Sequence, residues 1–206
     1  MTAALTTSID RPVVRARWAT AGTFAVNGAM AGSYASRIPG LKSTLDVSDS
    51  GLGRTLFALA IGSLISLQFA GKAVGRFGSR RCSLAGSTTS VIGFLLLGIA
   101  DTVPVAVTGL LIMGAGFSLL DVAMNSQAVF VELDYHRPIM SSFHAAFSIG
   151  SLIGAGLGAI LAHQDVGQQT QYVVTAIVTG ALVLGCISQM RGSDPAASAP
   201  ADGEAT

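Results

Sequence analysis

The chain has 206 residues, of which 50% are hydrophobic and only 11% are charged, and its formal net charge is +1. A soluble globular domain carries about 25% charged residues, so this chain has too few charges to cover a water-facing surface. The small net charge gives no indication of nucleic acid binding. The composition therefore predicts a protein embedded in a lipid bilayer, and the absence of short alternating segments predicts an all-α bundle, not a barrel.

In chain order, six stretches are apolar over about 20 residues, the length that a helix needs to cross a hydrocarbon core of about 30 Å. They are residues 18–36, 52–71, 82–100, 103–125, 141–162 and 171–190. Residues 1–17 form a polar N-terminal tail, and residues 18–190 a six-helix transmembrane bundle. Residues 191–206 are rich in Pro, Ala and Gly and predict a disordered linker or tail.

The distribution of basic residues predicts the orientation of these spans. Loops rich in Lys and Arg stay on the cytoplasmic side of a membrane. With the N-terminus inside, nine of the twelve basic residues are cytoplasmic, so both termini are expected in the cytoplasm. Arg37 and Tyr34 then fall at the outer interface, where a long cation extends to water. No cleavage site follows the first apolar stretch, which we interpret as a retained span.

The segment between the second and third predicted spans reads GKAVGRFGSRR, from Gly71 to Arg81. Gly71 and Gly78 permit the positive φ that ends a helix and reverses the chain, and the cations keep the segment in the cytoplasm. This basic, glycine-punctuated pattern resembles the signature between the second and third spans of the major facilitator superfamily, with Gly75 where that family has an Asp. The resemblance implies a gating loop, which comprises Gly71, Arg76, Gly78, Arg80 and Arg81.

The same resemblance implies the N-terminal six-helix half of a secondary transporter in the bacterial inner membrane, with spans one to three and four to six as inverted repeats. Such a half works by alternating access against a complementary six-helix bundle or a second copy of the chain. Its cytoplasmic basic segment is expected at the seam between bundles, paired with Glu132 or Asp134. A non-transporting membrane assembly or regulatory protein is the alternative.

Span four carries a polar stripe, since Ser118, Asp121 and Asn125 lie on one helical face together with Gly114 and Glu132. Asp121 lies eleven residues before Glu132, or about 16 Å from the cytoplasmic end at 1.5 Å per residue. An acid at this depth costs at least about 2.5 kcal/mol and must face the bundle interior or a wet cavity. It predicts a proton site or a substrate acceptor; the alternative is an Asp that ties helices together.

Residues 114–125, which read GAGFSLLDVAMN, resemble the fourth span of bacterial facilitators related to the fucose:proton symporter. The resemblance implies that Asp121 takes the place of the sugar-contacting acid. The symporter's other acid, in span one, would fall at Ala35, a turn before Pro39. That acid is missing from this chain.

Spans one and five supply further polar candidates. Asn27 lies near the middle of span one and is expected to meet the same cavity as Asp121 or to hold helices together. His144 shares a face of span five with Ser148, about 9 Å from the cytoplasmic loop, and Gln127 is expected nearby. The four-residue spacing of Gly150, Gly154 and Gly158 predicts a close-packing seam.

The sequence shows no paired acids at one depth, no zinc-spaced His/Cys cluster and no phosphate-binding loop. We therefore expect no enzyme activity, no cofactor and no metal. The predicted function is half of a secondary active transporter for a small polar solute, with a proton as the candidate coupling ion.

Overall fold

The computed structural model describes residues 10–190, which form seven helices and no strand. The helices are α1 (Arg11–Ser36), α2 (Ile38–Leu45), α3 (Asp49–Phe77), α4 (Ser79–Gly98), α5 (Val103–Tyr135), α6 (Met140–His163) and α7 (Gln168–Ser188). The all-helical expectation is thus confirmed for this part of the chain. The C-terminal segment 191–206 lies outside the described residues.

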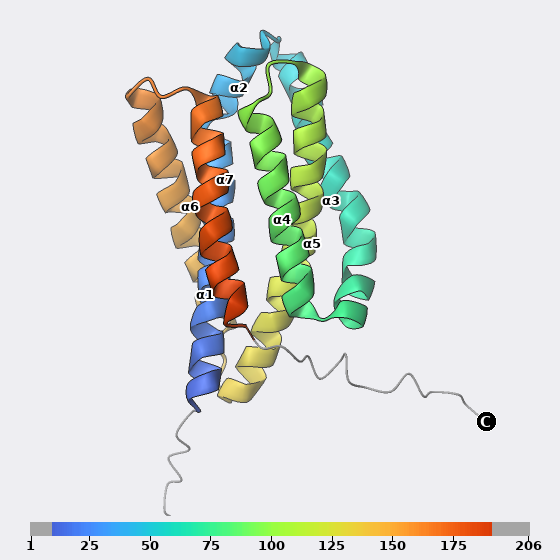
Figure 1. Cartoon of the computed structure of the whole chain (residues 1–206), viewed down its shortest axis with the longest axis vertical. Helices are drawn as coiled ribbons and strands as arrows, with labels where there is room; N and C mark the ends of the chain where they lie inside the picture. Colours follow the sequence, from blue (N-terminus) through green and yellow to red (C-terminus); the bar gives the residue numbers. More distant parts are fainter. Residues whose placement is uncertain (1–9, 191–206) are drawn as a thin grey trace, which may run out of the picture.

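Six of the helices are long and run alternately up and down as one bundle (Figure 1). Helix α1 packs chiefly against α6, while α5 packs against both α3 and α4, and α7 closes the bundle against α1 and α4. The short helix α2 lies across the upper end in Figure 1, and the start of α1 and the end of α7 both lie at the opposite end. The two described ends are therefore on the same side of the bundle.

Four helices, α3, α5, α6 and α7, are long and apolar enough to cross a membrane. Helices α1 and α4 do not reach the same mean hydropathy, because α1 is rich in Gly and polar residues after its three arginines and α4 combines two arginines with six Ser and Thr residues. Both nevertheless lie alongside the other four in the bundle (Figure 1). The structure thus identifies four spans by length and composition, against the six that the sequence predicts.

The helix bounds differ from the predicted spans mainly at the lower end. Helix α1 begins at Arg11, because Pro12 occupies a first-turn position that needs no N–H donor. Helix α5 continues ten residues beyond Asn125 and ends where His136 adopts a left-handed conformation, shortly before Pro138. Hydrophobicity indicates which part of a helix lies in lipid. It does not indicate the residue at which the backbone hydrogen bonds of the helix end.

The basic segment between α3 and α4 is almost entirely helical, which corrects the expectation of a loop from Gly71 to Arg81. Helix α3 continues through Gly71 and Gly75 to Phe77, and both glycines face open space. Only Gly78, at φ 84°, has the positive φ that reverses the chain. The prediction for Gly78 is confirmed and that for Gly71 is wrong, since a helix tolerates a glycine at a cost of about 1 kcal/mol.

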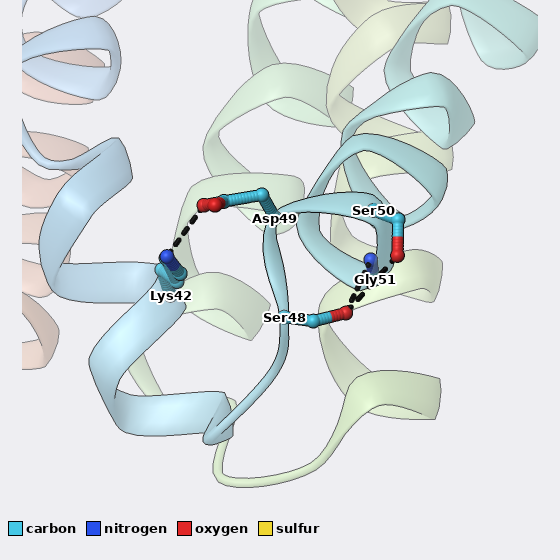
Figure 2. Close-up of polar contacts among 5 residues, drawn as sticks. All are labelled: Lys42, Ser48, Asp49, Ser50 and Gly51. Atoms are coloured by element: carbon cyan, nitrogen blue, oxygen red, sulfur yellow. Dashed lines mark hydrogen bonds and ion pairs between the residues drawn. The ribbon is translucent and has the colours of Figure 1, made fainter.

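The short helix α2 was not predicted, and polar contacts fix its junction with α3 (Figure 2). Lys42 Nζ contacts Asp49 Oδ1 at 2.5 Å. The Ser48 hydroxyl accepts a hydrogen bond from the Gly51 N–H at 3.2 Å and so caps the start of α3. Arg37, between α1 and α2, is buried and donates to the Val166 carbonyl of the α6–α7 connection, so the expectation of a cation extending to water is wrong.

Glycines bring the long helices into backbone contact at two crossings. At the crossing of α1 with α6, a Cβ on Gly28 would overlap the Phe147 carbonyl oxygen, and one on Gly150 would overlap that of Ala25. At the crossing of α3 with α5, Gly62 lies in the same way against Leu111, and Gly114 against Leu59. Gly154 lies against Ala29 and Gly158 against Ser36, so the predicted seam in α6 is confirmed.

Candidate functional site

The centre of the candidate site is a pair of polar residues on α5. Asp121 is exposed at the bundle surface and Asn125 is half-buried one turn later. The Asn125 amide Nδ2 donates to Asp121 Oδ1 at 3.2 Å and to the Asp121 carbonyl oxygen at 2.9 Å. The predicted i,i+4 pairing therefore forms, and it fixes the carboxylate while leaving its surface side open.

His144 on α6 lies close enough to Asp121 for the two side chains to interact electrostatically. It is exposed, and its ring meets Phe24 of α1 edge-on, with 5.5 Å between ring centroids. Ser148, one turn further along α6, donates its hydroxyl hydrogen to the His144 carbonyl oxygen at 3.1 Å. Counting residues places Asp121 and His144 at different depths, but the two groups still interact electrostatically.

Asn27 and Ser118 flank this pair without joining it through a hydrogen bond in the structure. Asn27 is 5% exposed, and its Nδ2 lies 3.9 Å from the sulfur of Met124, while its Oδ1 has no hydrogen-bond partner. Ser118 is half-buried one turn before Asp121 on α5. Asn27 thus reaches the α1–α5 contact at Met124, with a buried amide oxygen that has no hydrogen-bond partner.

The residues of the expected gating loop do not gather at this site. Arg80 donates from Nε to the Ile187 carbonyl and from Nη2 to the Ser188 carbonyl, both at 3.1 Å, and so caps the end of α7. Arg76 and Arg81 are exposed at the lower end. Glu132, expected to pair with the basic segment, instead accepts hydrogen bonds from the N–H groups of Ile139 and Met140 and caps α6.

Two residues have surroundings that sequence patterns did not indicate. Phe24, which is 1% exposed, stacks on Phe143 and supports the His144 ring. Gln127 is fully buried, and its Oε1 accepts from the Ser79 hydroxyl of α4 at 2.6 Å, a contact that the sequence did not predict. Helix α5 is apolar around most of its circumference, so its sequence does not indicate which neighbouring helix packs on which side. Periodicity therefore could not have predicted these contacts.

Within residues 10–190, no group of three or more His, Cys, Asp or Glu side chains is placed to hold a metal ion. The cluster of Asp121, Asn125 and His144 offers one carboxylate, one amide and one imidazole at the surface of a helix bundle. Such groups exchange protons and form hydrogen bonds with a small polar molecule. They lie on helices that are long and apolar enough to span a membrane.

Comparison with known proteins identifies the family. The family model described as "Major Facilitator Superfamily" matches residues 20–205. The chain belongs to the Major Facilitator Superfamily. It is 33% identical over 163 residues to the uncharacterized transporter y4wD of Sinorhizobium fredii, with 79% of this chain and 43% of the relative covered. It is 29% identical over 184 residues to an uncharacterized MFS-type transporter of Yersinia pestis, which covers 89% of this chain and 48% of that one.

The fold agrees with this assignment. The crystal structure of the nucleoside transporter NupG superposes with a TM-score of 0.68 at 14% identity, over 91% of this chain and 46% of that one. At that identity the likeness concerns the fold alone. This chain spans less than half the length of the relatives described above. The superfamily and these relatives are transporters and not enzymes, and the facilitator resemblance drawn from the basic segment is confirmed at the level of the superfamily.

Proposed function

We propose that this chain is the N-terminal half of a secondary active transporter that moves a small polar solute by alternating access, with a proton as the coupling ion. The observation that carries the proposal is the exposed carboxylate of Asp121 on a membrane-spanning helix, hydrogen-bonded by Asn125 and within electrostatic reach of His144. This arrangement combines a proton acceptor with two hydrogen-bonding groups at one place.

The position of Asp121 supports a wet cavity around it. The residue lies 18 residues after Val103 and 14 before Tyr135, or about 27 and 21 Å from the two ends of α5 at 1.5 Å per residue. A carboxylate facing lipid at such a distance from both ends is costly, by about 2.5 kcal/mol or more. Something polar must therefore cover this face, and a second bundle that encloses a water-filled cavity meets the requirement.

We further propose that all six long helices cross the bilayer as two inverted three-helix repeats. The glycine contacts support this, because the two crossings use equivalent positions. Each contact residue of α1 has its equivalent in α5, 86 residues later, as Gly28 has Gly114. Each contact residue of α3 has its equivalent in α6, 88 residues later, as Gly62 has Gly150. Helices α1 and α5 run in opposite directions (Figure 1). Both termini then face the cytoplasm of a bacterial inner membrane, as the basic residues predict.

The covering bundle is a complementary six-helix half or a second copy of this chain. In either case we propose that the face with Asp121, Asn125, Asn27, Ser118 and His144 lines the central cavity, and that the segment from Gly71 to Arg81, with Arg76, Gly78 and Arg80, lies at the cytoplasmic seam as a gate. The chain alone does not transport. Native mass spectrometry of the assembly purified through a tag on the chain should show two bundles per particle.

The test of function is the substitution Asp121→Asn, which keeps the size of the side chain and removes its titratable proton. The tagged assembly is reconstituted in liposomes with a pH-sensitive dye inside, and solutes are screened for a solute-dependent proton signal. The panel begins with hexoses, because residues 114–125 resemble the fucose:proton symporters, and with nucleosides, because the fold resembles NupG. We expect a loss of at least about tenfold in the proton signal, with an unchanged melting temperature.

The matched control is Asp101→Asn, which removes an exposed carboxylate from the connection between α4 and α5. It should leave the proton signal unchanged. A signal that survives Asp121→Asn contradicts the proton site, and aggregation of this variant alone would assign Asp121 to holding helices together. The absence of any solute-dependent flux in the intact assembly would favour a non-transporting assembly or regulatory protein.

A further inference from the structure

A narrow slot of about 320 Å³ runs between α6 and α7, with α1 as its floor. Helices α6 and α7 make few direct contacts with each other, so the slot opens to the surroundings of the bundle. One wall is formed by Ile153, Leu157 and Leu161 of α6, and the other by Val174, Val178 and Leu182 of α7. The slot exists because α6 and α7 each pack against α1 but barely touch each other.

The length of the slot matches one leaflet of a bilayer. It extends along α7 from Gln171 to Leu182, which are eleven residues or about 16 Å apart at 1.5 Å per residue. Half of a hydrocarbon core of about 30 Å has nearly the same depth. Gln171 lies one turn inside the upper end of α7, so the polar end of the slot is near the membrane interface on the α2 side.

The polar end contains a buried amide with one atom unpaired. Gln171 is 2% exposed, and its Nε2 donates to the Ser33 Oγ at 3.0 Å. The Ser33 hydroxyl also contacts Thr175 Oγ1 at 3.0 Å, but Gln171 Oε1 has no hydrogen-bond partner. If the amide is turned over, the atom left unpaired is Nε2 in place of Oε1. A hydroxyl satisfies either orientation, since it both donates and accepts.

The volume, the apolar walls and the unpaired amide of the slot indicate which kind of molecule it binds. Water requires two to four polar partners in a cavity, and the hydroxyls that line the slot below Gln171, those of Thr175 and Thr179, already have partners within the protein. A transmembrane helix is about 10 Å across, too wide for a slot of this volume. We propose that the slot binds one acyl chain of a phospholipid from the leaflet on the α2 side, with a hydroxyl of a glycerol-type headgroup at Gln171. The site is separate from Asp121 and does not depend on the proposed transport function.

The test compares two lipids of equal charge. The chain is placed in nanodiscs that contain equal amounts of phosphatidylglycerol and phosphatidylethanol with identical acyl chains, and the lipids retained after detergent extraction are counted by native mass spectrometry. Phosphatidylethanol carries the same single negative charge but no headgroup hydroxyl. We expect one lipid per chain, with phosphatidylglycerol favoured about twofold to tenfold, the range of one net hydrogen bond.

Three variants separate the chain-binding walls from the headgroup contact. Gln171→Leu should still retain one lipid but lose the preference for phosphatidylglycerol. Leu157→Trp fills the slot and should abolish retention, whereas Leu152→Trp, at a 75% exposed position of α6 outside the slot, should not. Val178→Trp fills the slot from the opposite wall and replaces Leu157→Trp if that variant does not fold.

Equal retention of lipid by Leu157→Trp and Leu152→Trp would overturn the proposal. So would a wild-type chain that retains no lipid, which is the result expected if a helix of a second bundle covers the slot. Equal retention of the two lipids by the wild-type chain would overturn the hydroxyl contact at Gln171.

Discussion

The crossing of α1 with α6 and the crossing of α3 with α5 are built from equivalent contacts but differ one turn further on. Gly28 and Gly150 of the first correspond to Gly114 and Gly62 of the second, each against a backbone carbonyl. One turn later the first crossing has another glycine pair, Gly32 and Gly154, again against carbonyls. At the same offsets the second crossing has Ser118 and Ser66, two larger and polar residues.

This difference concerns the face of α5 that carries Ser118 and Asp121. Two consecutive glycine pairs hold α1 and α6 at backbone contact over two levels, which leaves no room for side chains between them. In the other crossing a single pair sets the contact, and Ser118 leads on to Asp121 along the same face of α5. At the offset of 86 residues, Asp121 corresponds to the exposed Ala35 of α1, so only one of the two crossings carries an acid.

The largest effect is expected at the first glycine level of the α1–α6 crossing. Gly150→Leu places a side chain against the Ala25 backbone, which cannot move aside, and we expect loss of folded protein. Gly156→Leu, on the same helix at a position with open space, should fold normally. Size-exclusion profiles and yields of the two variants in detergent check this. Equal yields would mean that the crossing does not hold the bundle together.

The equivalence of the crossings predicts equal costs for equivalent substitutions. Gly62→Ala and Gly150→Ala each place a methyl group against a carbonyl oxygen of the partner helix, so each should lower the free energy of unfolding by about 1–3 kcal/mol. Unfolding in a titration with sodium dodecyl sulfate measures both. A cost confined to α6 would contradict the equivalence.

At the second level, one turn further along, equivalent substitutions in the two crossings should change the free energy of unfolding by different amounts. Gly154→Ser introduces into α6 the residue type found at the equivalent position of α3, and its Cβ would overlap the Ala29 carbonyl oxygen, so a cost of about 1–3 kcal/mol is expected. The reverse change, Ser66→Gly, should cost only the helix propensity of about 0.5–1 kcal/mol. The same unfolding titration checks the pair, and similar costs would show that the two crossings do not differ in tightness.

The smallest effect is expected away from the crossings, at the lower end of the bundle. Arg80→Gln removes charged hydrogen bonds to two carbonyl groups at the end of α7 and should cost about 1 kcal/mol. Arg81→Gln, at an exposed neighbouring position, should change the free energy of unfolding by less than about 0.5 kcal/mol. A larger cost for Arg81 would place the important contact of the basic segment elsewhere.

Much of the candidate site could be predicted because it depends on spacing along one helix. Asp121 and Asn125 are four residues apart, so they lie on one face of any helix that contains them, and their hydrogen bond forms in the structure. Gln127 and His144 depend on which helices lie on either side of α5. That arrangement depends on where glycines allow two helices to pack closely. The periodicity of a single helix does not predict which helices pair in this way.

By itself, the sequence determined that the chain is helical and membrane-embedded, that residues 150–158 form a glycine seam, and that the basic segment is of the facilitator type. These features follow from local composition and helical spacing, which act over a few turns. Only the tertiary structure decided that Arg37 is buried, that the segment from Gly71 to Phe77 completes α3, that Arg80 caps α7, and that α6 and α7 leave a slot between them. Those outcomes depend on contacts between residues far apart in the chain. A glycine can lie in a loop or in a helix, and an arginine can be exposed or can cap a helix, and the segments that pack beside them decide which.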